Sequence, residues 1–127
     1  ELARDSGLTK TDHPLAPLIK ESTMLESLEK MLAKGVDNSL LRFGLGKGYL
    51  DLGENAKAAE HFQRCVEFDP KYSAAWKLLG KAHLALADYP AARQAWEQGL
   101  EAARGHGDKQ AEKEMTVFLK KLERQAH

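Results

Sequence analysis

The chain has 127 residues, the size of one domain with a modest hydrophobic core. Its 19 basic and 19 acidic residues balance, which argues against nucleic acid or an anionic membrane as the main target, because both attract basic surfaces. No run approaches the roughly 18 apolar residues of a membrane span, and no signal peptide is visible. The single cysteine excludes an internal disulfide framework and fits a reducing compartment, so we expect a cytoplasmic protein.

The first part of the chain differs in pattern from the rest. Residues 1–22 show no sustained hydrophobic period and are predicted to be a flexible or extended arm, with one apolar stretch from Pro14 to Ile19. We expect this stretch to pack on the folded domain or on a neighbouring copy. Thr23 and Glu26 form a capping box that opens a helix predicted over residues 23–34. This helix is interpreted as an N-terminal cap of a domain that covers residues 23–125.

A repeated pattern organises the middle of the chain. Leu45-Gly46 recurs as Leu79-Gly80, and neighbouring residues recur in the same register. The matched pairs include Ser39 and Ser73, Lys47 and Lys81, Leu50 and Leu84, Leu52 and Leu86, Ala58 and Ala92, and Glu67 and Glu101. A fixed period of this size, about 34 residues, indicates units that bury their apolar faces against their neighbours. We place repeat 1 at residues 39–72 and repeat 2 at residues 73–106.

Each repeat is predicted to hold two short antiparallel helices. In repeat 1 the apolar residues fall at helical spacing on both sides of Gly53-Glu54-Asn55, which breaks the pattern. Gly46 and Gly80 lie within helices, where glycine costs about 1 kcal/mol relative to alanine. We therefore expect the paired helices to cross closely at these glycines, with Ala58 and Ala92 opposite.

The last segment is predicted to be one further helix. Gly105-His106-Gly107 ends repeat 2, and Asp108 can cap a C-terminal helix over residues 108–125. Its apolar stripe consists of Ala111, Met115, Phe118, Leu119 and Leu122. The repeat motif is absent here, as is typical of a terminal helix that closes the core.

The repeats resemble the tetratricopeptide repeat, whose signature is W-x2-L-G-x2-Y…A-x3-F…P. The first copy has Leu45, Gly46, Tyr49, Ala58, Phe62 and Pro70, with Arg42 in the place of tryptophan. The second has Trp76, Leu79, Gly80, Ala92 and Trp96, with His83 and Arg104 in the places of tyrosine and proline. The resemblance implies an all-α fold: a short right-handed helical solenoid of about six helices, with two full repeats between N- and C-terminal capping helices.

Members of this family are mostly scaffolds that hold a peptide or partner protein in a concave groove. By register, the groove would be lined by Leu40, Phe43, Lys47, Leu50, Ala74, Lys77, Lys81 and Leu84. The three lysines beside apolar side chains suit a segment with apolar side chains and acidic or carboxylate groups. The resemblance thus implies a non-catalytic adaptor. The alternative is a structural or self-assembly module whose arm or exposed helix face mediates homo-oligomer formation.

The remaining candidate sites favour structural interpretations. The run Gly44-Leu45-Gly46-Lys47-Gly48 lacks the spacing and the strand context of a phosphate-binding loop. Cys65 is expected in the core and His61 on the surface, and no histidines or cysteines show metal-ligand spacing beyond this loose pair. The acidic pair Glu112 and Glu114 is interpreted as part of a solvated helix face. No nucleophile, base and orienting group converge in the pattern, so no catalytic residue, metal or cofactor is predicted.

Overall fold

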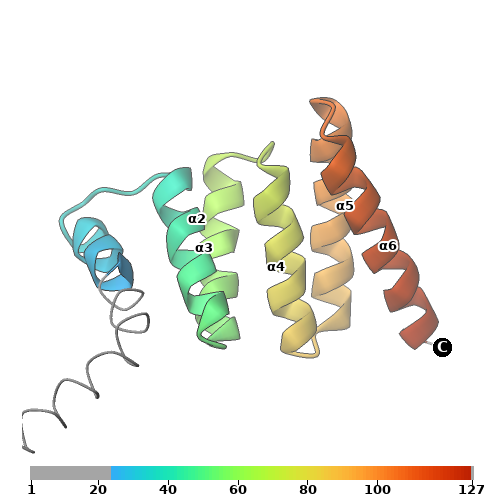
Figure 1. Cartoon of the computed structure of the whole chain (residues 1–127), viewed down its shortest axis with the longest axis horizontal. Coiled ribbons are helices and arrows are strands. Elements are labelled where there is room, and N and C mark those ends of the chain that lie inside the picture. The colour runs from blue at the N-terminus through green and yellow to red at the C-terminus, as the bar shows by residue number, and fades with distance from the viewer. Residues whose placement is uncertain (1–23, 127) are drawn as a thin grey trace, which may run out of the picture.

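The computed structural model describes residues 24–126, and all regular secondary structure in this range is helical (Figure 1). A first helix covers residues 24–33, and it is followed by α2 (Ser39–Asp51), α3 (Asn55–Phe68), α4 (Ser73–Ala85), α5 (Tyr89–Gly105) and α6 (Lys109–Ala126). The prediction of an all-α solenoid of about six helices is confirmed. The predicted arm over residues 1–22 and Thr23 of the capping box lie outside the described residues. No helix within 24–126 has the length and apolar character needed to cross a bilayer.

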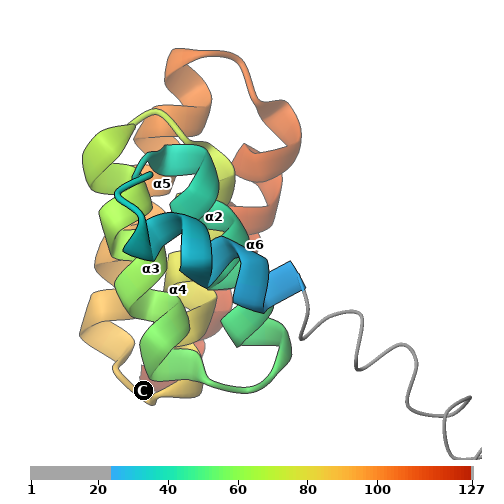
Figure 2. The same cartoon turned by 90° about the vertical axis from the view of Figure 1, so that its left-hand side faces the viewer.

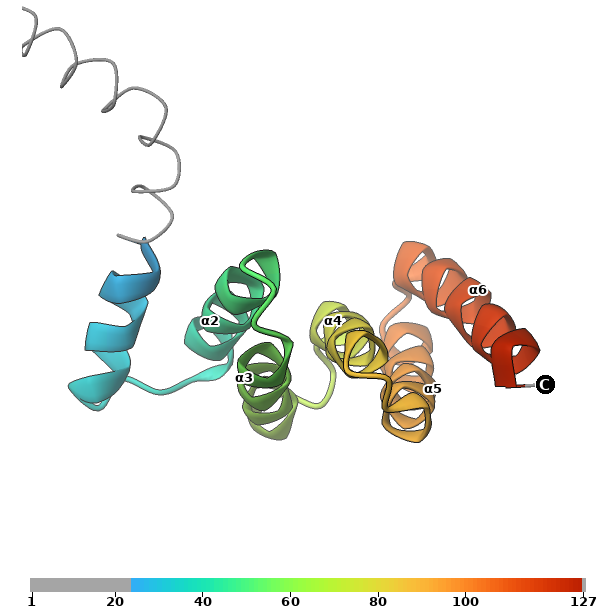
Figure 3. The same ribbon diagram turned by 90° about the horizontal axis from the view of Figure 1, so that it is seen from below.

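The helices form two layers. Each of α2 to α5 packs against the next helix in the chain, and Figure 3 shows α2, α4 and α6 in one layer with α3 and α5 in the other. Gly53 turns the chain between α2 and α3 with φ at 81°, and Ala87 does so between α4 and α5 with φ at 61°. These two positions are equivalent in the two repeats, so both helix pairs use the same left-handed turn.

Aromatic rings fill the centre of each helix pair. A Cβ on Gly46 would lie 2.6 Å from the Phe62 ring, and one on Gly80 would overlap the indole of Trp96. The close crossing expected at both glycines is present, but an aromatic side chain, rather than Ala58 or Ala92, contributes the nearest atoms. The rings extend across the interface, whereas an alanine methyl group does not.

The first helix packs on α2 through two further glycines. Figure 2 looks onto residues 24–33, which cross in front of α2 and α3. A Cβ on Gly48 would lie 2.8 Å from Cδ1 of Leu25, and one on Gly44 would lie 3.2 Å from Cδ1 of Leu28. The glycine run at 44–48 is therefore an internal part of helix α2 that accepts side chains from two neighbouring helices.

Candidate functional site

Among the predicted residues on α2, Phe43 makes the aromatic contacts. Its ring stacks on Tyr72, with 4.8 Å between centroids, and meets Phe62 edge-on at 5.8 Å. Lys47 is exposed and its Nζ lies 5.9 Å from the Phe43 centroid, within the range of a cation–π contact. Leu50 is half-buried against the core, and Leu40 is 72% exposed. Phe43 is thus an apolar platform held by two other rings, with an exposed charge beside it.

The predicted residues on α4 meet α6. Lys77 donates to Oε1 of Glu114 at 2.7 Å, and the Nζ of Lys81 lies 5.2 Å from the centroid of Phe118. Leu84 is exposed and lines a cavity of about 80 Å³ together with Phe118. Ala74 is half-buried near the start of α4. We call the surface formed by these residues of α2 and α4, together with Glu114 and Phe118 of α6, the α2/α4/α6 face.

The three lysines of this face differ in their availability to a ligand. Lys47 and Lys81 are exposed and lie over aromatic rings, so their ammonium groups remain available to a carboxylate. Lys77 is only partly exposed and is already paired with Glu114. The basic strip predicted from the sequence therefore has two available charges and one that is neutralised within the chain.

Asp108, at the start of α6, bonds to α4 and also caps its own helix. Asp108 accepts a hydrogen bond from the hydroxyl of Ser73 at 2.7 Å and caps α6 by accepting from the amide of Ala111 at 3.1 Å. The bonds from Ser73 and Ala111 lower the pKa of the Asp108 carboxyl. Its charge and both bonds position α6, and with it Glu114 and Phe118, beside the lysines of α4.

Sequence reasoning missed Glu114 and Phe118 as members of this face. The pattern alone favours a solvated position for Glu114 and a core position in the cap for Phe118. The register does contain a signal, because Leu50, Leu84 and Phe118 follow one another at intervals of one repeat period. α6 therefore stands where the first helix of a third repeat would stand.

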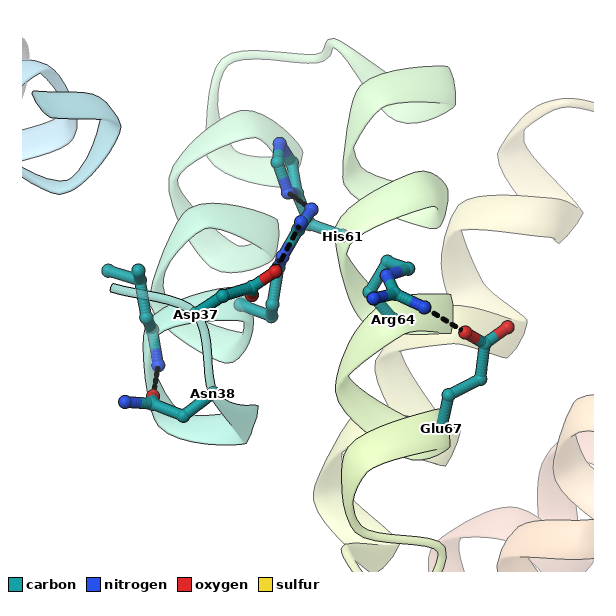
Figure 4. Close-up of polar contacts among 7 residues, drawn as sticks. Asp37, Asn38, His61, Arg64 and Glu67 are labelled. Carbon is teal, nitrogen blue, oxygen red and sulfur yellow. Dashed lines mark hydrogen bonds and ion pairs between the residues drawn. The ribbon is translucent and has the colours of Figure 1, made fainter. Parts of the chain in front are cut away.

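A polar cluster joins α2, α3 and the segment before α2. Arg42 binds Asp37 through two bonds, from Nε at 2.8 Å and from Nη2 at 3.0 Å, and its Nη1 donates to Nδ1 of His61 at 3.1 Å. Figure 4 shows Asp37 and His61 on opposite ends of this chain of contacts, with the separate Arg64–Glu67 pair on α3. The His61 ring also stacks on Tyr49, whose hydroxyl donates to Glu29 of the first helix.

The expected surface position of His61 is wrong. His61 is only 8% exposed, because Arg42 and Tyr49 on α2 enclose its ring. A guanidinium can only donate, so Nδ1 of His61 must be an unprotonated acceptor. Burial, and then the charge of Arg42, lower the pKa of His61. This cluster joins α2 to α3 and to the first helix.

Cys65 lies in the core, as predicted. Its side chain is fully buried, and burial raises the pKa of its thiol to about 11. Within residues 24–126 there is no group of three or more His, Cys, Asp or Glu side chains placed to hold a metal ion.

Cavities also lie along the other layer, which α3 and α5 form. Three of them, of about 260, 330 and 440 Å³, lie along α3 and α5 and share Gln63, His83 and Gln98 at their junctions. Alanine and glutamine side chains make up much of their lining. The exposed Lys57 lines the cavity of about 440 Å³ and also lies over an aromatic ring, that of Tyr49 at 5.2 Å. The α2/α4/α6 face differs in having two such lysines, Lys47 and Lys81, on neighbouring helices of one layer.

Comparison with known proteins agrees with this architecture. The family model of the tetratricopeptide repeat matches residues 49–112. Over 101 residues, the chain is 76% identical to the TPR repeat-containing protein PA0015 of Pseudomonas aeruginosa, a match that covers 80% of this chain and 96% of that protein. The chain belongs to the tetratricopeptide repeat family.

Two further proteins are similar to this tetratricopeptide repeat chain. It is 37% identical over 120 residues to the heat-shock protein cognate co-chaperone sgt12 of Aspergillus fumigatus, covering 94% of this chain but 35% of that protein. The first TPR of Spaghetti (RPAP3), solved with the HSP90 peptide SRMEEVD, superposes with a TM-score of 0.72 at 19% identity, over 99% of this chain and 95% of that one. The latter likeness establishes the fold alone.

Proposed function

We propose that this tetratricopeptide repeat protein is a non-catalytic, cytoplasmic adaptor that binds a short peptide segment on the α2/α4/α6 face. The observation that carries the proposal is the arrangement of Lys47 over Phe43 and of Lys81 over Phe118. Each of these two pairs of a lysine and an aromatic ring offers an ammonium group for a carboxylate, next to an aromatic surface for an apolar side chain. The ligand that fits best is a segment in which acidic and apolar residues alternate closely.

The exposed apolar residues support the same face. Leu40 is 72% exposed at one end of α2, and Leu84 is 37% exposed beside the small cavity at Phe118. Exposed leucines flanking the lysines give a ligand apolar area to bury, which is worth about 25 cal/mol per Å². The exposed lysines supply selectivity and faster association more than affinity, since each exposed ion pair is worth at most about 1 kcal/mol.

The relatives make peptide binding a reasonable expectation. A co-chaperone is among the proteins to which the chain is similar, and a protein of this fold has been solved with an acidic peptide. The carboxylate clamp of chaperone-tail binders is not reproduced, because Phe43 and Lys47 stand at the positions of its first lysine and its asparagine. We therefore propose the chemical class of ligand, an acidic and apolar segment, rather than a chaperone tail in particular.

The test uses the peptide SRMEEVD, which combines methionine and valine with three acidic side chains and a free carboxylate. Wild type is titrated by fluorescence anisotropy and by amide chemical-shift mapping, with amidated SRMQQVN, which has no carboxylate, as the control. We expect wild type to prefer the acidic peptide, with shifts centred on Phe43, Lys47, Lys81 and Phe118. A triple variant Lys47→Glu, Lys77→Glu, Lys81→Glu should lose binding, because repulsion replaces attraction.

Two results would contradict the proposal. Undiminished binding in the triple variant would show that these lysines play no part. Shifts confined to Gln63, Gln94 and Gln98 would place the ligand in the cavities along α3 and α5 instead.

A further inference from the structure

The pair of Lys77 and Glu114 joins α4 to α6 on the α2/α4/α6 face. The two side chains come from neighbouring helices of the same layer, and their charged atoms are 2.7 Å apart. Both stay accessible, with 24% of the Lys77 side chain and 34% of the Glu114 side chain exposed. Solvent and ligands can therefore reach this ion pair, which is not buried in the core.

The hydrogen bonds and positive charges around Glu114 favour its charged form and outweigh the opposite effect of its partial burial. Hydrogen bonds from Lys77 and from Gln110, followed by the charges of Lys77 and Lys81, lower the pKa of its carboxyl. Gln110 donates to the second carboxylate oxygen at 3.2 Å. Glu114 thus presents to Lys77 the same group, a carboxylate, that an acidic peptide would bring.

We propose that Glu114 is an internal competitor for acidic ligands, which occupies Lys77 from within the chain and limits the affinity of the α2/α4/α6 face. This inference rests on the proposed function. A ligand carboxylate near Lys77 has either to displace Glu114 or to accept its repulsion. Glu114 consequently sets how many acidic groups the face accepts, and it favours ligands whose carboxylates reach Lys47 and Lys81.

The chain offers a matched control on the same helix. Glu112 also lies on α6 and forms an ion pair, but its partner is the exposed Arg104 of α5, at 3.0 Å. Glu112→Gln changes the net charge as Glu114→Gln does, without freeing a lysine of the face. In both variants the glutamine keeps the size of the side chain and an oxygen acceptor, and circular dichroism melting checks that both fold.

The experiment titrates SRMEEVD against wild type, E114Q, E112Q, K77M and K77M/E114Q at low salt. We expect E114Q to bind about threefold to fivefold more tightly than wild type, the scale of one exposed ion pair. The affinity of E112Q should stay close to that of wild type. K77M/E114Q should bind as K77M does, because Lys77, which E114Q would otherwise free, is replaced in both. The gain of E114Q should disappear at about 0.5 M salt through screening.

A second measurement needs no variant. In wild type, saturating peptide should raise the pKa of the Glu114 carboxyl toward its ordinary value, as followed by carboxyl carbon NMR, because a ligand carboxylate either replaces it on Lys77 or adds a negative charge beside it. If wild type binds the peptide but E114Q matches E112Q, or if this pKa stays unchanged, the competitor role is wrong and the proposed function stands. If the triple lysine variant binds as well as wild type, the proposed function itself fails.

Discussion

Gly80 and Trp96 touch so closely that no side chain fits between their helices. The indole nitrogen that a Cβ on Gly80 would overlap also donates a hydrogen bond to the carbonyl oxygen of Lys77, at 3.0 Å. The same relation of glycine to ring occurs one repeat earlier, between Gly46 and Phe62. Both helix pairs are thus held at a distance set by a glycine opposite an aromatic ring, and this distance determines where Lys77 and Lys81 lie.

Replacing Gly80 with alanine should destabilise the protein by about 1–3 kcal/mol, because the new Cβ would overlap the buried indole and displace it from its hydrogen bond to the Lys77 carbonyl oxygen. The free energy of unfolding from urea denaturation measures the effect. Gly105→Ala is the matched control, since a Cβ there meets no atom within 4 Å and the last turn of α5 should gain helix propensity, up to about 1 kcal/mol. Equal stability of the two variants would mean that α4 and α5 do not cross at Gly80.

At Ala87, replacement by glycine should stabilise the protein. Its φ of 61° lies in the left-handed region, where a residue with a Cβ is strained by about 1–2 kcal/mol, and the equivalent residue of repeat 1 is Gly53. Ala87→Gly should raise the free energy of unfolding by about 0.5–1 kcal/mol, after the larger entropy of the unfolded glycine is subtracted. The reverse change, Gly53→Ala, should lower it. A loss of stability in Ala87→Gly would show that Ala87 does not adopt the left-handed conformation of Gly53.

The repeat made most of the fold predictable from sequence. Leu-Gly pairs separated by one repeat period locate the helix pairs, because a glycine tolerated inside a helix signals close packing. The face was harder to predict. Lys77 and Glu114 meet where α4 and α6 lie side by side, and the bond between Ser73 and Asp108 also joins these helices; no local pattern encodes such long-range contacts. The burial of His61 likewise depends on the position of Arg42 on another helix.

Cys65 should be unreactive in the folded protein. Its thiol is fully buried, and a pKa of about 11 leaves little of the thiolate that attacks a disulfide reagent. At pH 8 a chromogenic disulfide should modify Cys65 at the rate of unfolding, and immediately once denaturant is added. Fast modification of the native protein, at a rate independent of its stability, would show that α3 is not packed as described.

His61 should make stability fall in mild acid. Because the folded state lowers the pKa of His61 below its ordinary 6.5, the unfolded chain binds the proton more readily, and the free energy of unfolding decreases as the pH falls below about 6.5. A proton on Nδ1 of His61 would be a donor that faces the donor Nη1 of Arg42, which cannot accept a hydrogen bond. Glu29, Glu60 and Asp37 act in the opposite sense on this pKa but do not reverse its direction.

The variant His61→Gln isolates this effect, because glutamine can still accept from Arg42 but does not titrate. Urea denaturation at pH 7, 6 and 5 should show a smaller loss for His61→Gln than for wild type. Below about pH 5 both proteins should lose stability, as carboxylates with lowered pKa such as Asp108 become protonated. Parallel curves between pH 7 and 5 would argue that His61 is not buried in solution.

The three lysines of the α2/α4/α6 face should contribute unequally to peptide binding. Lys47→Ala and Lys81→Ala should each weaken SRMEEVD binding about twofold to fivefold, because each removes an available charge worth at most about 1 kcal/mol. Lys77→Ala should weaken it less, since this ammonium is already paired with Glu114. Fluorescence anisotropy at two salt concentrations measures the variants, and the differences should shrink as salt rises.

Lys57→Ala is the control for this series. The Nζ of Lys57 also lies over an aromatic ring, that of Tyr49 at 5.2 Å, but Lys57 belongs to α3 in the other layer. If Lys57→Ala weakened binding as much as Lys81→Ala, overall charge rather than this face would control the interaction. If Lys77→Ala had the largest effect of the four, Glu114 would not be neutralising Lys77 in solution.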